Sequence, residues 1–184
     1  DITATDLSGT VVLQTTLNKY VSNAYLKAVV TFDGKIVSDK KLLLNGVTSV
    51  GTISVDNPKL WNVGEPNLYD IEYTLYVDEQ QIDKVKAYFG IRRIDIDGYK
   101  VLINGKSIFQ RLILDQGFYP DGIYTAPSDE HLKRDIELSM QLGFNGARLH
   151  EKVFEERYLY YADRAGYLVW GEFPDWGMDI TSLD

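Results

Sequence analysis

The chain has 184 residues, 45% of them hydrophobic, which is enough to bury a core in one large domain or two small ones. It contains no cysteine and two histidines, which excludes disulfides, thiolate metal sites and a cysteine nucleophile and disfavours a zinc site built on histidines. The net charge of −8, without a basic cluster, argues against nucleic acid as a partner, and the lack of an apolar run of about 18 residues argues against a membrane-spanning helix.

Residues 1 to 93 have the pattern of an antiparallel β-sandwich of about seven strands, with short apolar alternations separated by turn residues. Asp33-Gly34 lies between two such alternations and predicts a hairpin, since both central residues of a type I′ turn need positive φ. We therefore predict an immunoglobulin-like first domain over residues 1–93. Its strands are expected at residues 11–13, 24–30, 35–37, 51–55, 69–77 and 82–89.

Residues 94 to 110 form a second, smaller block with two further turn signals. Asp97-Gly98 and Asn104-Gly105 separate three short apolar runs and predict a small meander. We interpret the meander as a junction and assign it to a second domain over residues 94–184.

From residue 111 the pattern changes to strand, helix, strand, helix and strand. The first helix is capped by Ser128, presents Leu132, Ile136 and Met140 on one face, and ends at Gly143. Apolar strands joined by helices are typical of a parallel sheet. Three strands and two helices cannot close an eight-stranded barrel, so we predict a truncated α/β segment. Its strands are expected at residues 111–115, 144–149 and 167–172, and its second helix at residues 154–165.

Several motifs at fixed spacing resemble glycoside hydrolase family 2, which includes β-galactosidases, β-glucuronidases and β-mannosidases. The resemblance is strongest where Asn145-Gly146-Ala147-Arg148 is followed by an Asp-x-x-Gly helix end and then by an apolar strand closed by Glu172. Shorter motifs precede these, namely Pro58-Lys59-Leu60-Trp61, Pro66-Asn67-Leu68-Tyr69, Phe89-Gly90-Ile91-Arg92 and the hairpin Ile103-Asn104-Gly105-Lys106.

The resemblance implies an immunoglobulin-like sandwich followed by the first three strands and two helices of a (β/α)8 barrel. It also implies a parent enzyme that hydrolyses the O-glycosidic bonds of β-glycosides by a retaining mechanism with two carboxyl groups. In the family both carboxyls are glutamates on the fourth and seventh barrel strands. We therefore expect no catalytic residue in this chain and no activity of the fragment alone.

The chain departs from the family pattern at two places that face the sugar. The family has a histidine three residues after the arginine, whereas Glu151 stands there and His150 is offset by one. On the first barrel strand, the family's Asn-Arg-His-Glu element is replaced by Leu114-Asp115-Gln116-Gly117. Both departures predict an altered substrate pocket, so the resemblance does not specify the sugar or the linkage.

Two residues at the ends of the second and third predicted strands are the main candidates for supporting an active site. By resemblance, Arg148 would orient and hold the nucleophile through charge-assisted hydrogen bonds, and its alternative is a surface ion pair. The resemblance gives Glu172 a supporting or metal-binding role, with direct catalysis or an ordinary surface acid as alternatives. No metal site is assigned within the chain and no cofactor is expected, although the resemblance allows a divalent cation in the full-length enzyme.

Four further residues near the same strand ends are candidates for binding a sugar. His150 could bond a sugar hydroxyl or be an ordinary loop histidine, and Asp115 and Gln116 could bind hydroxyls or only form the turn before Gly117. Trp176 lies in a loop and is a candidate platform, because an aromatic ring stacks on the apolar face of a sugar.

A different class of function stays open, namely a non-catalytic sandwich module that binds carbohydrate or protein. Such a module would need neither Arg148 nor Glu172. In the leading interpretation the partner is a carbohydrate substrate of the full-length protein. We expect a soluble chain whose incomplete barrel self-associates or is disordered after about residue 172. The compartment of the parent protein, periplasmic or extracellular locations included, is left open.

Overall fold

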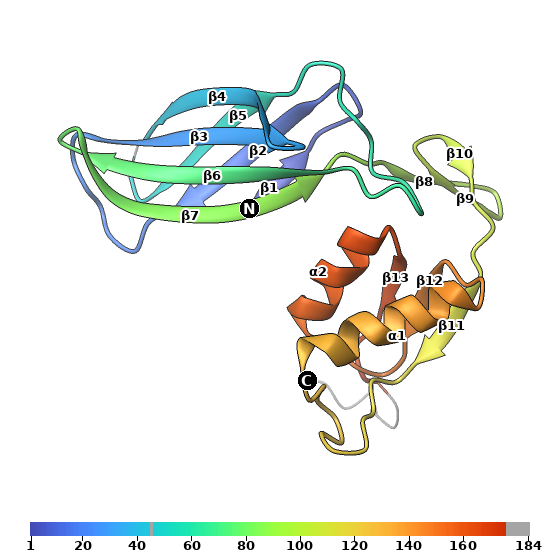
Figure 1. The fold of residues 1–184 in the computed structure, drawn as a ribbon. Coiled ribbons are helices and arrows are strands. Elements are labelled where there is room, and N and C mark those ends of the chain that lie inside the picture. Colours follow the sequence, from blue (N-terminus) through green and yellow to red (C-terminus); the bar gives the residue numbers. More distant parts are fainter. Residues whose placement is uncertain (45, 176–184) are drawn as a thin grey trace, which may run out of the picture. The chain divides into compact units, whose positions relative to one another are not determined.

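The computed structural model describes residues 1–44 and 46–175, which form two compact units (Figure 1). The first unit comprises residues 1–62 and 67–107, and the second comprises residues 63–66 and the chain from residue 108 onward. The meander belongs to the first unit, whereas the boundary that we predicted at residue 93 assigned it to the second domain. No helix among the described residues combines the length and the apolar character needed to cross a membrane.

The main part of the first unit is a sandwich of two antiparallel sheets, as the alternating pattern predicts (Figure 1). One sheet has the strand order β1-β2-β5 and the other has the order β4-β3-β6-β7. Alternate side chains of each strand enter a common core, for example Leu26, Ala28 and Val30 of β3. The strands are β1 Ile2–Ala4, β2 Thr10–Thr16, β3 Ala24–Phe32, β4 Lys35–Leu43, β5 Thr48–Ser54, β6 Leu68–Val77 and β7 Gln80–Gly90.

Tyr69, at the start of β6, connects the core to the segment that precedes it. Its hydroxyl accepts the N–H of Lys59 at 2.6 Å and donates to the carbonyl of Lys59 at 3.3 Å, while its ring stacks on Phe89 at 5.2 Å between centroids. A tyrosine that reaches back to the upstream backbone from this strand is a feature of immunoglobulin-like sandwiches. The bond is in keeping with the class of sandwich that we predicted.

Two hairpins of the larger sheet show how much of the turn chemistry is visible in the sequence. Asp33 and Gly34 have φ values of 49° and 73° and close the predicted hairpin between β3 and β4. Asp78 and Glu79 close the β6–β7 hairpin with φ values of 48° and 62°, although neither is a glycine. Asn23 stabilises that conformation, because its side-chain amide donates to the Asp78 carboxylate at 3.1 Å and its carbonyl accepts the Asp78 N–H at 3.1 Å.

The predicted meander consists of β8 (Ile94–Asp97), β9 (Lys100–Ile103) and β10 (Lys106–Ser107) in antiparallel order. Asn104 and Gly105 have φ values of 52° and 77° in its second turn. The Asn104 side chain accepts the N–H of Arg93 at 2.9 Å and donates to the carbonyl of Trp61 at 2.9 Å. Asn104 therefore does more than bend the chain, since it ties the meander to the segment that follows the sandwich core.

The second unit is a parallel sheet of order β11-β12-β13 with a helix in each crossover (Figure 1). Its core contains Leu132 and Ile136 from the first helix, Ala147 and Leu149 from β12, and Tyr158 from the second helix. Apolar side chains on these helix faces are buried against the sheet, which accounts for the helical spacing seen in the sequence. The elements are β11 Leu112–Asp115, α1 Asp129–Gln141, β12 Gly146–Leu149, α2 Glu156–Ala165 and β13 Leu168–Gly171.

Two details of the helices differ from the sequence prediction. Met140, expected on the apolar face of α1 with Leu132 and Ile136, is 36% exposed. Ser128 precedes α1 as predicted, but its hydroxyl bonds the ring Nδ1 of His131 at 3.1 Å and makes no cap to the backbone. Gly166 ends α2 in a left-handed conformation with φ of 68°, as predicted.

Gly146 allows the three parallel strands to approach one another at the centre of the second unit. A Cβ at this position would lie 2.6 Å from the Cβ and from the carbonyl oxygen of Leu168. Gly146→Ala is therefore expected to lower the free energy of unfolding by about 1–3 kcal/mol, the usual cost of overpacking. Gly171→Ala is the matched control, since an added Cβ there meets nothing within 4 Å. Chemical denaturation of the 184-residue chain measures both, and equal midpoints would contradict the packing role of Gly146.

Candidate functional site

Arg148 and Glu172 lie together at the carboxyl edge of the parallel sheet. Arg148 is the third residue of β12, and Glu172 follows the last residue of β13. The guanidinium Nε of Arg148 donates to Oε1 of Glu172 in an ion pair. The hydrogen bond and charge of Arg148 hold the pKa of the Glu172 carboxyl below its ordinary value, which keeps this carboxyl ionised. The sequence placed both residues at this edge, and the structure brings them into direct contact.

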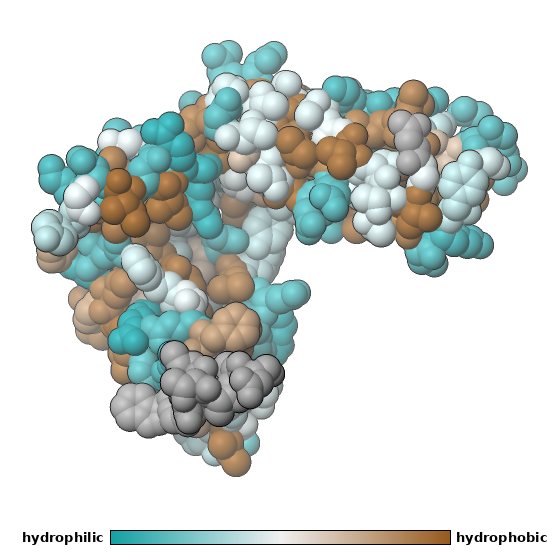
Figure 2. Space-filling model, turned by 180° about the vertical axis from the view of Figure 1, so that it is seen from behind, coloured by the Kyte–Doolittle hydropathy of each residue, from teal (hydrophilic) through white to brown (hydrophobic). Residues whose placement is uncertain are grey.

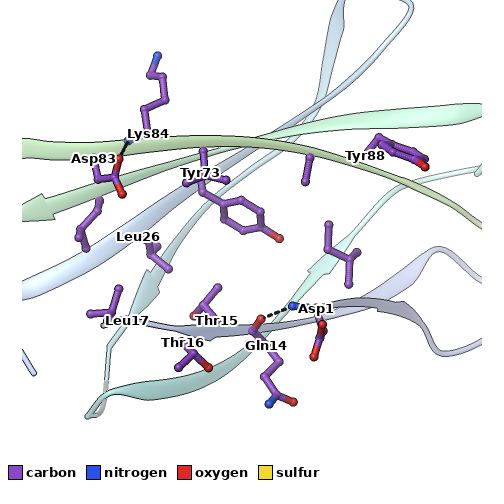
Figure 3. Close-up of a pocket in the computed structure, with 14 residues that line it drawn as sticks. Asp1, Gln14, Thr15, Thr16, Leu17, Leu26, Tyr73, Asp83, Lys84 and Tyr88 are labelled. Atoms are coloured by element: carbon purple, nitrogen blue, oxygen red, sulfur yellow. Dashed lines mark hydrogen bonds between the residues drawn. The ribbon is translucent and has the colours of Figure 1, made fainter. Parts of the chain in front are cut away.

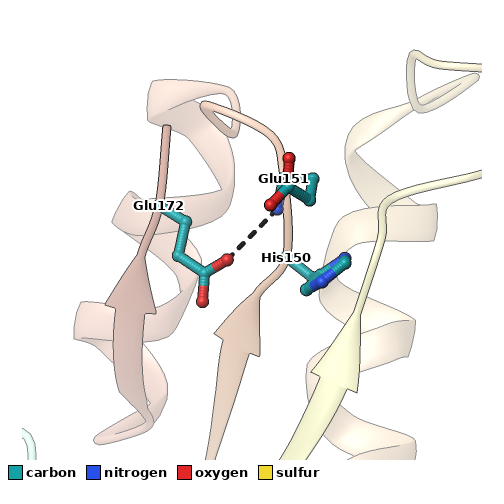
Figure 4. A group of neighbouring side chains, drawn as sticks. All are labelled: His150, Glu151 and Glu172. Carbon is teal, nitrogen blue, oxygen red and sulfur yellow. Dashed lines mark hydrogen bonds between the residues drawn. The ribbon is translucent and has the colours of Figure 1, made fainter. Parts of the chain in front are cut away.

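Glu151, the second residue after β12, links this ion pair to the loop beyond β13. Its backbone N–H donates to Oε2 of Glu172 at 3.3 Å (Figure 4), and its carboxylate accepts the N–H of Asp175 at 3.0 Å. Glu151 has a φ of 54°, a conformation that costs a non-glycine residue free energy and is found where contacts around it enforce it. The hydrogen bond and negative charge of Glu151 raise the pKa of the Asp175 carboxyl.

His150, Glu151 and Glu172 could each offer one ligand atom to a cation. These atoms lie within 4.8 Å of one another, and Figure 4 shows the three side chains at the ends of neighbouring strands. However, Glu172 is already paired with Arg148, whose positive charge opposes a cation at this point. The geometry therefore supports an electrostatic role for Glu172 over a metal-binding one, and we assign no metal here.

Asp115 and Gln116 at the end of β11 have different surroundings. Oδ1 of Asp115 accepts the N–H of Gly117 at 2.8 Å, which is the turn-forming role considered for it. Burial raises the pKa of the Asp115 carboxyl, against the lowering effect of this hydrogen bond. Gln116 is exposed, and its Nε2 lies 3.3 Å from Nδ1 of His150. The structure thus brings Gln116 and His150 together at the sheet edge, where both can meet a ligand.

A cavity of about 430 Å³ opens beside these residues. Its aromatic wall consists of Phe118 and Tyr124, whose ring centroids lie 5.3 Å apart at an interplanar angle of 55°. The cavity is lined by Gln116, Phe118, Tyr124, His150 and Glu151. The two aromatic residues were not among the sequence candidates, since a phenylalanine and a tyrosine in a loop have no spacing that distinguishes them from packing residues.

Lys152 is a third residue that was not among the sequence candidates. It is 6% exposed, and its ammonium donates to the carbonyl of Gly117 at 3.1 Å and to that of Tyr124 at 2.7 Å. The same Nζ lies 4.6 Å from the ring centroid of Tyr124 and 4.8 Å from that of Phe154. Lys152 therefore fastens both ends of the loop that carries Phe118 and Tyr124.

Comparison with known proteins identifies the family to which these features belong. Residues 3–92 match the model of Glycosyl hydrolases family 2. The chain belongs to glycosyl hydrolase family 2. This confirms the resemblance that the motifs indicated.

Individual family 2 relatives match most of this chain. It is 31% identical to a β-galactosidase of Lactococcus lactis over 75% of the chain and 14% of the relative. It is 30% identical to a β-glucuronidase of Paenibacillus borealis over 79% of the chain and 24% of the relative. The crystal structure of a family 2 member from Bacteroides cellulosilyticus superposes with a TM-score of 0.82 and 25% identity, over 94% of the chain and 25% of that structure. The chain thus spans a quarter or less of the length of these relatives.

Two tryptophans, Trp170 and Trp176, follow one another closely in the sequence at the end of β13. Trp170 in β13 is 52% exposed, and its Nε1 donates to Oε1 of Gln110 at 2.6 Å. It is therefore only partly a packing residue among the described residues. Trp176, the candidate stacking platform, lies outside the described residues.

A larger cavity, of about 530 Å³, lies in the sandwich (Figure 3). Leu26, Tyr73 and Leu75 line its inner part, and burial raises the pKa of Tyr73 to about 12, so the phenol is neutral at physiological pH. Lys84, which also lines the cavity, forms an ion pair with Glu72 at 2.7 Å. All of its lining residues belong to the sandwich, and none of them is among the candidate site residues.

The Arg148–Glu172 pair predicts a pH dependence with a defined sign. A carboxyl whose pKa is lowered by folding stabilises the folded state above the ordinary value of 4.5, and this contribution is lost as the pH falls through the lowered pKa. In a carbon-detected NMR titration of the side-chain carboxyls, Glu172 is expected to titrate below 4.5. Arg148→Met should move that midpoint upward. A midpoint at or above 4.5 in the unmodified chain would contradict the pair in solution.

Proposed function

We propose that the protein containing this chain is a retaining β-glycosidase, and that the chain supplies its immunoglobulin-like sandwich and the first three strands of a (β/α)8 barrel. The parallel order β11-β12-β13 with a helix in each crossover supports this reading of the second unit. Active sites of such barrels form at the carboxyl ends of the strands. The polar residues that we selected from the sequence gather at that end.

The observation that carries the proposal is the Arg148–Glu172 ion pair. An arginine has five N–H donors, and among the residues that the structure describes the Nε bond to Glu172 leaves the donors of its two terminal nitrogens for another anionic oxygen. Glu172 fixes the direction of the guanidinium, while Arg148 stays 52% exposed at its side chain. In the proposed enzyme these free donors hold the catalytic nucleophile ionised and correctly oriented.

The proposed catalytic glutamates lie on the fourth and seventh barrel strands, outside these 184 residues. Glu172 does not replace the general acid, because its lowered pKa keeps it ionised where an acid must be protonated. The isolated chain is therefore proposed to be inactive.

Hydrolysis of 4-nitrophenyl β-glycosides tests this proposal. The full-length parent protein should release 4-nitrophenol with retention at the anomeric carbon, and the 184-residue chain at equal concentration should not. Turnover by the chain that persists after repurification would overturn the assignment of the catalytic residues. A parent protein that hydrolyses no β-glycoside would overturn the proposed function itself.

The open sheet of the second unit predicts self-association of the isolated chain. Among the described strands, β11 and β13 each pair only with β12, and Leu114 and Trp170 on them are 57% and 52% exposed. Hydrophobic residues also reach the surface on the face drawn in Figure 2. Unpaired edges and exposed apolar side chains favour association, so light scattering is expected to show species larger than 21.0 kDa. A monodisperse monomer would contradict this.

A further inference from the structure

The cavity beside Gln116 has the composition of a sugar-binding subsite. Phe118 and Tyr124 are 61% and 45% exposed, so neither ring is held by a core. A sugar ring has one apolar face that stacks on such rings and a rim of hydroxyls that bonds polar groups. Gln116, His150 and Glu151 provide the polar groups of the same lining.

The aromatic wall is fixed in place before a ligand arrives. Lys152 holds the carbonyls of Gly117 and Tyr124, which lie at the two ends of the loop. Within the loop, Tyr119 and Ile123 exchange backbone hydrogen bonds of 2.9 and 2.8 Å. The hydroxyl of Tyr124 also donates to the carbonyl of Glu151 at 3.1 Å. A wall that is ordered in advance loses little conformational entropy on binding.

The charges around the cavity disfavour an acidic ligand. Three carboxylates, Glu151, Glu172 and Asp175, follow β12 and β13 within hydrogen-bonded contact of one another. Of the nearby cations, Arg148 is paired with Glu172, and Lys152 is buried with its ammonium on backbone carbonyls. A carboxylate on the sugar would therefore lie beside the carboxylate of Glu151, which lines the cavity, and two like charges repel each other.

We propose that this cavity is a subsite for a neutral pyranose ring, with Phe118 and Tyr124 as its stacking wall and Glu151 as the residue that disfavours uronic acids. The inference rests on the proposed glycosidase function and narrows its substrate class. It separates this chain from those of its relatives that are named β-glucuronidases.

Binding to the full-length parent protein tests the charge selectivity independently of catalysis. The probes are methyl 1-thio-β-D-galactopyranoside and its C6 carboxylate, with the same pair in the gluco configuration, because thioglycosides resist hydrolysis. Saturation-transfer NMR and calorimetry should show the neutral member of at least one pair binding about tenfold or more tightly than its uronate. Equal or tighter binding of both uronates, or binding of none of the four, would overturn the inference. If a neutral ring binds and no glycoside is hydrolysed, the proposed function fails and the subsite stands.

Substitutions in the aromatic wall, at Phe118, and at the charged residue Glu151 complete the test. Phe118→Ala should weaken binding of the neutral ring by about tenfold, and Phe118→Tyr should retain it. Phe109→Ala is the matched control, since Phe109 is 80% exposed and precedes β11 at its opposite end. Glu151→Gln should narrow the preference for the neutral ring over the uronate. Unchanged binding by Phe118→Ala, or an unchanged preference in Glu151→Gln, would remove the corresponding residue from the subsite.

Discussion

Replacing Arg148 with methionine is expected to lower the kcat of the full-length parent enzyme by about 10²- to 10³-fold, with a smaller change in KM. The variant removes the guanidinium and keeps the aliphatic stem. Its effect falls on kcat because the proposed partner of Arg148 is the nucleophile, whose charge changes during the reaction, rather than the bound sugar. Steady-state kinetics with an aryl β-glycoside measures the change.

The loss of kcat in Arg148→Met must be separated from a general effect of removing an exposed arginine. Arg157→Met provides the control, because Arg157 pairs with Asp129 and Glu155 on the surface of the same unit. Its removal should leave kcat within about twofold, as exposed ion pairs contribute little. Arg148→Lys should recover only part of the activity, since lysine keeps the charge and loses the planar fork. Full activity of Arg148→Met would show that Arg148 forms only a surface ion pair and has no role in catalysis.

The strands of the sandwich could be predicted because their signals are local. Asp33-Gly34 and Asn104-Gly105 adopt the positive φ values that their residue types allow. Asp78 and Glu79 adopt the same conformation without that signal. Their turn is supported by Asn23, more than fifty residues earlier in the chain, a tertiary contact that no local pattern contains.

The candidate site likewise contains some residues that could be predicted from the sequence and others that could not. Arg148 and Glu172 could be placed at one edge because parallel strands bring the residues after them together at fixed spacing. The roles of Gly117, Tyr124 and Lys152 depend on a loop that returns to the end of β12, and the length of a loop does not specify where it packs. The sequence identified the strand ends and left out the aromatic wall beside them.

The predicted burial of Met140 failed for a related reason. Its spacing with Leu132 and Ile136 is correct for one helix face, and those two residues are buried. Periodicity gives the direction of a side chain, but burial also needs a neighbouring element. At this end of α1 the buried residue is Ser139, next to Met140, and its hydroxyl lies 2.6 Å from that of Tyr167.

Replacing Lys152 with methionine is expected to lower the free energy of unfolding of the second unit by about 2–3 kcal/mol. Methionine fills a similar volume and removes the desolvation cost of a buried ammonium, which by itself would stabilise the variant. Against this, the carbonyls of Gly117 and Tyr124 lose hydrogen bonds to a charged donor, each contributing about 1.5–3 kcal/mol. We expect the loss of two such bonds to outweigh the gain.

Denaturant unfolding of the 184-residue chain measures this loss, and Lys133→Met is its control. Lys133 lies on α1 with its ammonium 3.9 Å from Glu130 and 4.7 Å from the ring centroid of Tyr161, and removing these two contacts should change stability by less than about 1 kcal/mol. Because Lys152 fixes the aromatic wall, Lys152→Met should also weaken binding of a neutral sugar ring by the parent protein, whereas Lys133→Met should not. A destabilised variant with unchanged sugar affinity would show that Lys152 supports the fold alone and that the wall keeps its position without it.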